Sequence, residues 1–421
     1  MSYIASPVDA DAAAHHTGPS GQPAPGRVVV VSASVGAGHD GAADQLGRRL
    51  TALGWPVERW DFLDLLPART GQLMCGSYHR MLALAPSLYQ RIHDTTERAG
   101  RPGALQRALL GRAQSRLLRR LPADTRAVVS TYPLAGQALG ALRRSGRLSV
   151  PVITYLTDFS VHPLWVAPGV DVHLAAHAIP AAEAAGHGAA GTLVAGPLVD
   201  ERFTPAGAVE RRAARARFGL PADERLALLV AGSWGVGEVA RVAAEVRDSG
   251  TALPVVVCGR NEALRRRLLA AGIRHVYGWV ADMPGLMHAA DVLVQNAGGL
   301  TSLEAFASGL PVAGYRCLPG HGRTNAAALD RAGLAVWIRD PERLAAVLAE
   351  LMDGPRGRGQ RAAGLALFAS PGGPAHAVVR AAVSASVSAA PWIPAPRDVQ
   401  DPAYRTAPLG TLTDLAQGGH R

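Results

Sequence analysis

A strand, glycine loop and helix pattern occurs twice in this 421-residue chain, and it limits the fold more than any other feature. The first copy joins a continuous apolar run at 28–31 to a glycine-rich turn at 36–38 and a helix with regularly spaced apolar residues. The second copy joins the run at 226–230 to glycines within 232–237 and another helix. Continuous aliphatic runs are typical of strands buried on both faces of a parallel sheet. We therefore predict an α/β protein with two doubly wound parallel-sheet domains that face a cleft.

Length and composition fit two domains. With 48% hydrophobic residues the chain can fill two cores of ordinary size. The first 26 residues are rich in Ala, Gly, Pro, Ser and His without periodicity, which is typical of disorder. We expect this division: a disordered leader at 1–26, a first domain at 27–199, a second domain at 200–372, a closing helix at 373–390 and a disordered tail at 391–421.

The formal net charge of +10, carried almost wholly by arginine, favours nucleotides, phospholipid surfaces or nucleic acid as partners. Nucleic acid is the least favoured of these, because the arginines are not interleaved with aromatic residues. Cys75, Cys258 and Cys317 have neither disulfide nor metal-ligand spacing, which suits a reducing cytosol and predicts no metal cluster. No apolar run reaches the ~20 residues of a membrane span. The N-terminus lacks a signal-peptide pattern, so we expect a cytoplasmic protein.

Residues 290–312 read as a buried strand, a Gly298-Gly299 turn, a short helix and the start of another strand. A turn that leads directly into a helix N-terminus is an anion site, because free N–H groups and the positive end of the helix dipole both face it. Glu304 lies about one helical turn further on, where it can accept hydrogen bonds from hydroxyl groups. A phosphate at the turn and a sugar at the carboxylate indicate a nucleotide. The alternative is an ordinary turn of a parallel-sheet protein.

Two residues of the first domain are candidates for a base. His39 lies at a helix start, where the dipole disfavours the protonated form and leaves a neutral imidazole. Asp158 follows an apolar run in TDFSVHPLW, at the carboxyl edge of the predicted sheet, and can orient a substrate hydroxyl or take its proton. A capping histidine and a loop-capping aspartate are the plainer interpretations of these two residues.

Residues 71–121 are predicted to be helical and differ in character from their neighbours. The second helix of this region places leucines on one side and Arg112, Arg116, Arg119 and Arg120 on the other. A basic amphipathic pair of helices can lie on an anionic membrane. The alternative is a core-packed helix pair with a solvated basic face.

Seven motifs together resemble one family: GAGHDGAA, TYPLAG, TDFSVHPLW, AGSWGVGE, CGRNEAL, NAGGLTSLEA and PGHGRTNA. In this order they resemble the monogalactosyldiacylglycerol synthase and processive diacylglycerol glucosyltransferase family. A more distant relative is the N-acetylglucosaminyltransferase that makes the peptidoglycan lipid precursor. The resemblance runs from about Arg27 to Gly333.

The resemblance implies a B-type glycosyltransferase fold whose second domain binds a UDP-sugar and whose first domain binds a lipid acceptor at the membrane surface. It implies inverting transfer of a hexose from UDP-hexose to a lipid, with diacylglycerol as the first choice, by a cytoplasmic, peripherally membrane-associated hexosyltransferase without a cofactor. Three alternatives stay open: transfer to a soluble acceptor, a UDP-sugar epimerase, and a catalytically decayed UDP-sugar-sensing membrane adaptor.

The resemblance also implies roles for individual residues. His39 and Asp158 match the acceptor-side base candidates, and the region 71–121 matches a membrane-facing insertion. For the donor it implies Gly232, Ser233 and Gly235 at the phosphates, the main chain near Val280 at uracil, Gly298, Gly299, Leu300 and Thr301 at the diphosphate, Glu304 at the ribose, and His321 and Asn325 at the sugar.

The sequence departs from the family's pattern in two places. His321 and Gly322 stand where the family usually has Gln and an acidic residue that touches donor-sugar hydroxyls. Asp200 stands where the family often has an arginine near the phosphates. Arg202 and Arg260 are the candidates to replace that arginine.

Overall fold

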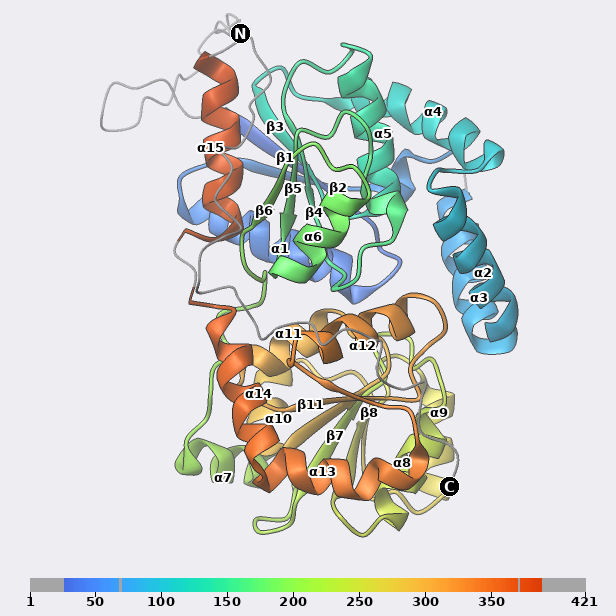
Figure 1. Ribbon diagram of the computed structural model, residues 1–421, viewed down its shortest axis with the longest axis vertical. Coiled ribbons are helices and arrows are strands. Elements are labelled where there is room, and N and C mark those ends of the chain that lie inside the picture. Colours follow the sequence, from blue (N-terminus) through green and yellow to red (C-terminus); the bar gives the residue numbers. More distant parts are fainter. Residues whose placement is uncertain (1–25, 68–69, 370–371, 388–421) are drawn as a thin grey trace, which may run out of the picture.

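The computed structural model describes residues 26–67, 70–369 and 372–387, and two parallel β-sheets flanked by helices account for most of them (Figure 1). Each sheet has six strands. The prediction of two doubly wound α/β domains is therefore confirmed. The predicted leader, apart from Gly26, and the predicted tail lie outside the described residues.

The first sheet has the strand order β2-β1-β3-β4-β5-β6, with all neighbours parallel. In β1, Val28 and Val30 join one hydrophobic core and Val29 and Val31 join the other. Successive strand residues face opposite sides, so a strand covered on both faces needs an unbroken apolar run. The strands are β1 (Arg27–Ser32), β2 (Val57–Asp61), β3 (Thr125–Ser130), β4 (Val152–Tyr155), β5 (Val172–Ala175) and β6 (Thr192–Val194), with helices α1 (Ala37–Ala52), α5 (Pro133–Arg144) and α6 (Ala178–Gly186) and 3-10 turns η1 (Phe62–Leu65) and η2 (Pro163–Trp165).

The second sheet has the order β12-β11-β10-β7-β8-β9 and is also parallel. Its strands are β7 (Leu226–Val230), β8 (Leu253–Val257), β9 (His275–Tyr277), β10 (Val292–Gln295), β11 (Val312–Tyr315) and β12 (Val336–Ile338). Its helices are α7 (Ala208–Arg217), α8 (Val239–Asp248), α9 (Glu262–Ala270), α10 (Met283–Ala289), α11 (Leu300–Ala307), α12 (His321–Arg331), α13 (Leu344–Asp353) and α14 (Pro355–Ala366), with the 3-10 turn η3 (Pro341–Arg343).

The strand order reverses direction once in each sheet, between β1 and β3 in the first and between β7 and β10 in the second. Ligands of open α/β sheets bind beyond the carboxyl ends of the strands at such a reversal. The segments that follow β1, β7 and β10 carry the sequence-predicted site residues His39, Gly232 and Gly298. Helices α11 and α12 lie between the two sheets and face the first domain (Figure 1).

The last described helix, α15 (Gly373–Val387), returns to the first domain (Figure 1). Val378 and Ala381 are buried in the same core as Val28 and Ala42. The chain therefore crosses between the domains twice, and its last described segment covers the first sheet.

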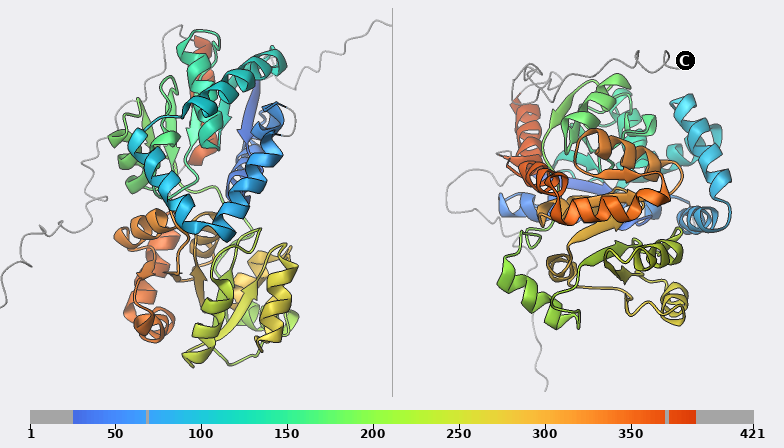
Figure 2. Two further views of the ribbon diagram at one scale, coloured as in Figure 1. Left: turned by 90° about the vertical axis from the view of Figure 1, so that its right-hand side faces the viewer. Right: turned by 60° about the horizontal axis from the view of Figure 1, so that its bottom comes forward.

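Three helices fill the region between β2 and β3: α2 (Thr70–Leu84), α3 (Pro86–Ala99) and α4 (Ala104–Arg120). Pro86 is the first residue of α3, where its missing N–H and fixed φ are tolerated. Figure 2 shows α2 and α3 as a hairpin that stands beside the first sheet and reaches the second domain. None of the helices in the described part of the chain combines the length and the apolar character needed to cross a membrane.

Helix α4 packs against the first domain, and part of its predicted basic face contacts the protein. Leu110 and Leu117 are buried in the core. Arg116 donates to the main-chain carbonyl of Leu65 at 3.2 Å, and the Arg120 guanidinium lies 5.1 Å from the ring centre of Trp60. Arg116 is therefore turned into the protein, while Arg112 and Arg119 are exposed.

A buried ion pair anchors the start of β10, the strand that leads to the Gly298-Gly299 turn. Asp291 accepts from Arg215 Nη2 and from the main-chain N–H of Leu226, both at 2.8 Å, and also from Arg211. Arg215 is only 4% exposed. Without the carboxylate its charge would be buried and unpaired.

We predict that Asp291→Ala lowers the free energy of unfolding by about 3–5 kcal/mol, the usual cost of removing one partner of a buried pair. Asp353 is a matched control, because it pairs with Arg225 at 2.6 Å while both side chains are about half exposed. Asp353→Ala should cost less than about 1 kcal/mol. Urea denaturation followed by circular dichroism compares the two, and equal losses would contradict the prediction.

Candidate active site

His39 is the third residue of α1, behind an N-cap at Gly36 that has no side-chain cap. Its Nδ1 lies 2.8 Å from the main-chain oxygen of Thr131 and 3.1 Å from Oγ1 of Thr157. A carbonyl oxygen can only accept, so Nδ1 carries the proton and Nε2 is left as the basic nitrogen. Burial lowers the pKa of His39 and keeps the ring neutral.

Aromatic rings enclose His39. The ring centres of Tyr132 and Trp165 lie 5.3 and 5.8 Å from its own. Trp165 Nε1 donates to Oδ2 of Asp158 at 3.1 Å, and Oδ1 of Asp158 accepts from Asn325 at 3.3 Å. Both oxygens of Asp158 are thus held by donors. Its negative charge opposes the effect of burial on the pKa of His39.

The turn before α11 has the form that an anion site needs. Gly298 has a φ of +73°, and a Cβ there would lie 2.7 Å from Cβ of Asn325, so only glycine fits. The side chain of Gln295 accepts from the N–H groups of Ala297, at 2.7 Å, and of Gly298, which fixes the turn. Gly299 is the N-cap of α11, and a Cβ there would meet nothing within 4 Å. The N-cap position therefore borders open space beside the first N–H groups of α11.

The N-terminus of α1 meets that of α11 where the domains touch. A Cβ at Gly41 would lie 2.6 Å from Cδ2 of Leu300. The side chain of Leu300 therefore packs on α1, which leaves its main chain for the predicted contact with a diphosphate. Thr301, the next residue, is partly exposed. Neither helix has a side-chain cap, so no capping side chain offsets the positive ends of the two dipoles, which lie close together.

The glycine loop after β7 divides into an open and a packed part. A Cβ at Gly232 would meet nothing within 4 Å, and Ser233 holds the loop by accepting from the main-chain N–H of Arg260 at 2.9 Å. A Cβ at Gly235 would lie 2.8 Å from the carbonyl oxygen of Cys258. Gly232 thus borders open space and Ser233 is partly exposed, whereas Gly235 is required for packing.

Glu304 lies in α11, one turn beyond Gly299, and is partly buried. Its carboxylate has no hydrogen-bond partner among the residues that the structure describes. Burial, and to a lesser degree the charge of Asp200, raises the pKa of Glu304 to about 7. A carboxylate in this situation lacks the donors that the hydroxyl groups of a ligand supply.

The two candidate phosphate-binding arginines, Arg202 and Arg260, have different partners. Arg202 donates to both oxygens of Asp200, at 3.1 and 3.0 Å, and this pairing lowers the pKa of Asp200 to about 2. Arg260 lies with its guanidinium 5.0 Å from the ring centre of Trp279, which is 58% exposed. Val280 follows Trp279 and packs partly against the core. Both predicted phosphate contacts are exposed, but Arg202 is held by a carboxylate whereas Arg260 stacks on an aromatic ring.

Asn325 and His321 join the domains, and their predicted place at the sugar stays a prediction. Asn325 is 1% exposed; its Nδ2 donates to Ala297 O at 3.1 Å, and its Oδ1 accepts from Ser160 N at 2.8 Å. His321 Nδ1 lies 3.0 Å from the hydroxyl of Tyr89 in α3.

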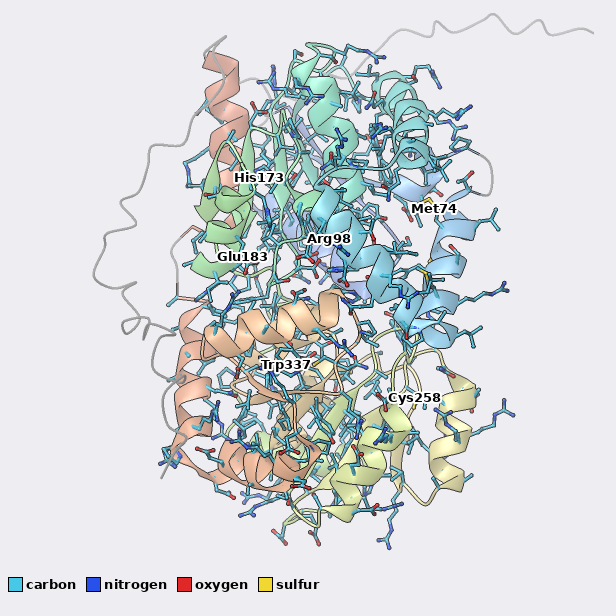
Figure 3. All side chains as sticks on the ribbon, turned by 45° about the vertical axis from the view of Figure 1, so that its right-hand side comes forward. Met74, Arg98, His173, Glu183, Cys258 and Trp337 are labelled. Atoms are coloured by element: carbon cyan, nitrogen blue, oxygen red, sulfur yellow. The ribbon has the colours of Figure 1, made fainter. Side chains whose placement is uncertain are left out.

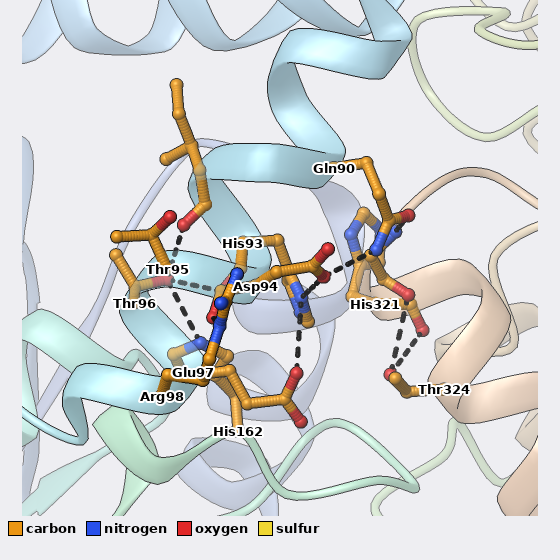
Figure 4. A network of polar contacts seen from close by, with 12 residues as sticks. Gln90, His93, Asp94, Thr95, Thr96, Glu97, Arg98, His162, His321 and Thr324 are labelled. Carbon is orange, nitrogen blue, oxygen red and sulfur yellow. Dashed lines mark hydrogen bonds and ion pairs between the residues drawn. The ribbon is translucent and has the colours of Figure 1, made fainter.

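Sequence reasoning missed the residues of α3 that reach the second domain (Figure 4). Gln90 accepts from the main-chain N–H of Gly320 at 2.7 Å, and the Tyr89 hydroxyl contacts His321. Within the first domain, the ring centre of His93 lies 4.9 Å from that of His162. Tyr89 and His93 are four residues apart and so share one face of α3. This spacing was the available sequence signal for a shared contact face on α3, but it does not identify the segment that this face contacts. Figure 3 shows the same boundary, with Arg98 of α3 and Glu183 of α6 near it.

The glycine at position 322, where the family usually has an acidic residue, has a steric cause. A Cβ at this position would lie 2.7 Å from the carbonyl oxygen of Asn296 and 2.9 Å from Cβ of Leu318. The backbone here therefore approaches the Gly298 turn too closely for an acidic side chain.

Comparison with known proteins covers both domains. Residues 39–194 match the family model for monogalactosyldiacylglycerol synthase, and residues 229–354 match that for glycosyl transferases group 1. The processive diacylglycerol beta-glucosyltransferase of Bacillus cereus is 31% identical over 221 residues, which are 51% of this chain and 56% of the relative. That of Bacillus mycoides is 30% identical over the same length. The predicted resemblance is confirmed. The chain spans little more than half the length of these relatives.

Solved structures agree on the fold. MurG of Acinetobacter baumannii has a TM-score of 0.51 at 17% identity, covering 85% of this chain and 99% of its own. UGT71G1 of Medicago truncatula, solved with UDP-glucose, has a TM-score of 0.54 at 13% identity, covering 86% and 98%. The B-type glycosyltransferase fold is thereby confirmed.

The pKa of Glu304 predicts a pH-dependent stability. Its value is raised from 4.5 to about 7 on folding, so the folded protein binds this proton more tightly than the unfolded chain. This contribution to stability is complete below pH 4.5 and is lost as the pH rises to about 7. We expect Glu304→Gln to gain stability over the wild type across that window, in protein without nucleotide. Urea denaturation at a series of pH values measures the difference, and a pH-independent difference would contradict the prediction.

Proposed function

We propose that this protein transfers a hexose from a UDP-sugar to the hydroxyl group of a lipid, with diacylglycerol as the first choice. One observation carries the proposal: neutral His39, with Nε2 as its basic nitrogen, lies in the first turn of α1, and this turn packs against the uncapped N-terminus of α11. The first can accept a proton from a hydroxyl group, and the second can bind a diphosphate. The names of the similar proteins, diacylglycerol beta-glucosyltransferases, support the choice of acceptor.

The reaction is one displacement with inversion. The acceptor hydroxyl gives its proton to Nε2 of His39, and its oxygen attacks the anomeric carbon from the side opposite UDP. The bond from that carbon to the diphosphate oxygen breaks, and UDP leaves with the electron pair. The main-chain N–H groups at the start of α11 stabilise the charge that develops on the departing diphosphate.

Asp158 acts as a positioning residue in this reaction. Its two oxygens are already hydrogen-bonded to Trp165 and Asn325, so His39 is the better base of the two. When His39 accepts the proton, the nearby negative charge of Asp158 stabilises the imidazolium.

The donor takes its place along α11. The diphosphate lies at Gly298, Gly299 and the main chain of Leu300, and the ribose hydroxyls donate to Glu304. These hydrogen bonds favour the ionised carboxylate, so we expect nucleotide binding to lower the pKa of Glu304 from its raised value.

An exposed apolar surface on α2 and α3 supports peripheral contact with a cytoplasmic membrane surface. Leu84 is 82% and Leu73 70% exposed, and Leu88 and Ile92 are about half exposed. Arg80 and Arg91 are exposed on the same helices. Apolar side chains flanked by arginine suit the interface of an anionic bilayer. This surface replaces the arginines of α4 as the main membrane contact that we propose.

We predict that His39→Ala lowers kcat by about 10²–10⁴-fold, the usual contribution of a general base, with little change in affinity for UDP. The assay combines purified protein, diacylglycerol vesicles and UDP-glucose, UDP-galactose or their N-acetyl forms, read by mass spectrometry. His376 is a matched control, because it is exposed on α15, and His376→Ala should keep full activity.

The same assay separates the alternatives. Absence of glycolipid with every donor would refute lipid transfer. Consumption of the UDP-sugar without any acceptor would instead indicate an epimerase, and binding of UDP without turnover an adaptor. Full turnover by His39→Ala would exclude His39 as the base.

We also predict that the double change Leu84→Ser and Leu88→Ser lowers binding to anionic vesicles at least tenfold. Burying one leucine side chain contributes about 1.5–3 kcal/mol, and two are removed. Vesicle co-sedimentation measures the effect. Val209→Ser is the control, since Val209 is 68% exposed on α7 in the second domain and should not affect binding. Equal losses in both variants would argue against a defined membrane surface.

A further inference from the structure

Three potential metal ligands lie together near the end of α3, beside the boundary between the domains (Figure 4). One ligand atom each from His93, Asp94 and Glu97 can be chosen so that all lie within 4.8 Å of one another. In the described ranges, this is the only group of three or more such side chains so close together. The prediction of no metal cluster rested on cysteine spacing. Cysteine spacing cannot detect a ligand set of one histidine and two carboxylates.

The imidazole of His93 is buried without a partner for one of its nitrogens. The side chain is 9% exposed, and Nδ1 has no hydrogen bond within the described part of the chain. Nδ1 lies 3.8 Å from Oδ1 of Asp94 and 3.8 Å from Oε2 of Glu97. These distances are too long for hydrogen bonds. A buried polar atom without a partner is costly, so its position between two carboxylates requires an explanation.

We propose that His93, Asp94 and Glu97 bind one divalent transition-metal ion, of the zinc or manganese class. Two atoms that each lie about 2.1 Å from a tetrahedral ion are about 3.4 Å apart, slightly less than the spacing seen here. One imidazole nitrogen with two carboxylate oxygens suits these ions better than magnesium or calcium, which prefer oxygen ligands alone. The ion also neutralises two carboxylates that otherwise repel each other.

The residues around the three ligands already orient them. Gln90 donates to Oδ1 of Asp94 at 2.7 Å, as an outer-shell partner of a metal-binding carboxylate does. His162 does not compete for the ion: its Nδ1 accepts from the N–H of Leu164 at 3.1 Å, and its Nε2 lies 3.2 Å from the Thr96 hydroxyl. The ligand set is therefore His93, Asp94 and Glu97, with open positions for water.

A cavity gives the ion a route and a place for that water. It has a volume of about 330 Å³ and is lined by His93 and Glu97 together with Glu183 of α6 and Arg331 of α12. It thus lies between both domains. Water in the cavity can complete the coordination of an ion held by three protein ligands.

The site is linked to the second domain through Gln90 and Gly320. Gln90 binds Asp94 with one end and the N–H of Gly320 with the other. Gly320 also lies against the imidazole, since a Cβ there would be 2.8 Å from Cγ of His93. An ion that fixes His93 and Asp94 therefore fixes the part of α3 on which the loop before α12 rests. Metal binding should raise the melting temperature of the whole protein.

The experiment uses the full chain after removal of metals by a chelator. Titration with Zn²⁺ and Mn²⁺ by calorimetry, and with Co²⁺ by visible absorption, should show one saturable site. Glu97→Gln and Asp94→Asn should each bind at least tenfold more weakly, because even outer-shell changes commonly cost 10–100-fold. Asp94→Asn keeps an oxygen for Gln90. Glu183→Gln is the matched control: it lines the same cavity but pairs with Arg331 at 2.6 Å, and it should bind like the wild type.

Circular dichroism without metal checks that each variant is folded, and Zn²⁺ should raise the melting temperature of the wild type and of Glu183→Gln only. The competing explanation is a protonated His93 that pairs with both carboxylates. It predicts no saturable binding by the wild type. That result, equal binding by all variants, or an equal loss in Glu183→Gln would overturn the proposal. None of these measurements depends on glycosyl transfer.

Discussion

The buried amide of Asn325 connects the loops on which both halves of the proposed site are built. It joins Ala297, in the turn before α11, to Asp158 and Ser160, in the loop after β4. Because the residue is 1% exposed, water cannot replace these hydrogen bonds, and each group left unpaired would cost about 1–3 kcal/mol. The distance between the proposed base and the proposed diphosphate position therefore depends in part on this side chain.

The starts of α1 and α11 also pack together, and in the proposed reaction these two helix N-termini have opposite chemical tasks. In α1 the dipole and burial disfavour a charged His39, so a base is available near neutral pH. Helix α11 has no side-chain cap, so the positive end of its dipole is free to stabilise a phosphate. In the proposed reaction Asp158 assists proton transfer to His39, because its negative charge favours the imidazolium that forms. The site therefore separates a region suited to developing positive charge from one suited to negative charge.

Sequence patterns predicted the features that depend on local periodicity. Val28 to Val31 could be recognised as a doubly covered strand, and Gly298 with Glu304 as a turn followed by a helix carboxylate, because these signals lie within a few residues. Pairs far apart in the chain carry no such signal. Tyr89 and His321 are 232 residues apart, and nothing in either segment names the other. The helical wheel of α4 likewise placed Arg116 on an outer face, whereas the carbonyls of Leu65 and Leu66 bind it.

The departure at His321 and Gly322 is best understood as a change of the whole loop. The absence of a side chain at position 322 lets the backbone approach Asn296, and His321 turns toward Tyr89 of the other domain. An acidic residue at 322 would therefore collide with the Gly298 turn before it could reach a sugar. We expect any recognition of donor-sugar hydroxyls at this loop to involve the Tyr89–His321 pair, because it occupies the start of α12. Since Tyr89 comes from α3, the choice of sugar and the contact between the domains would then depend on the same helix.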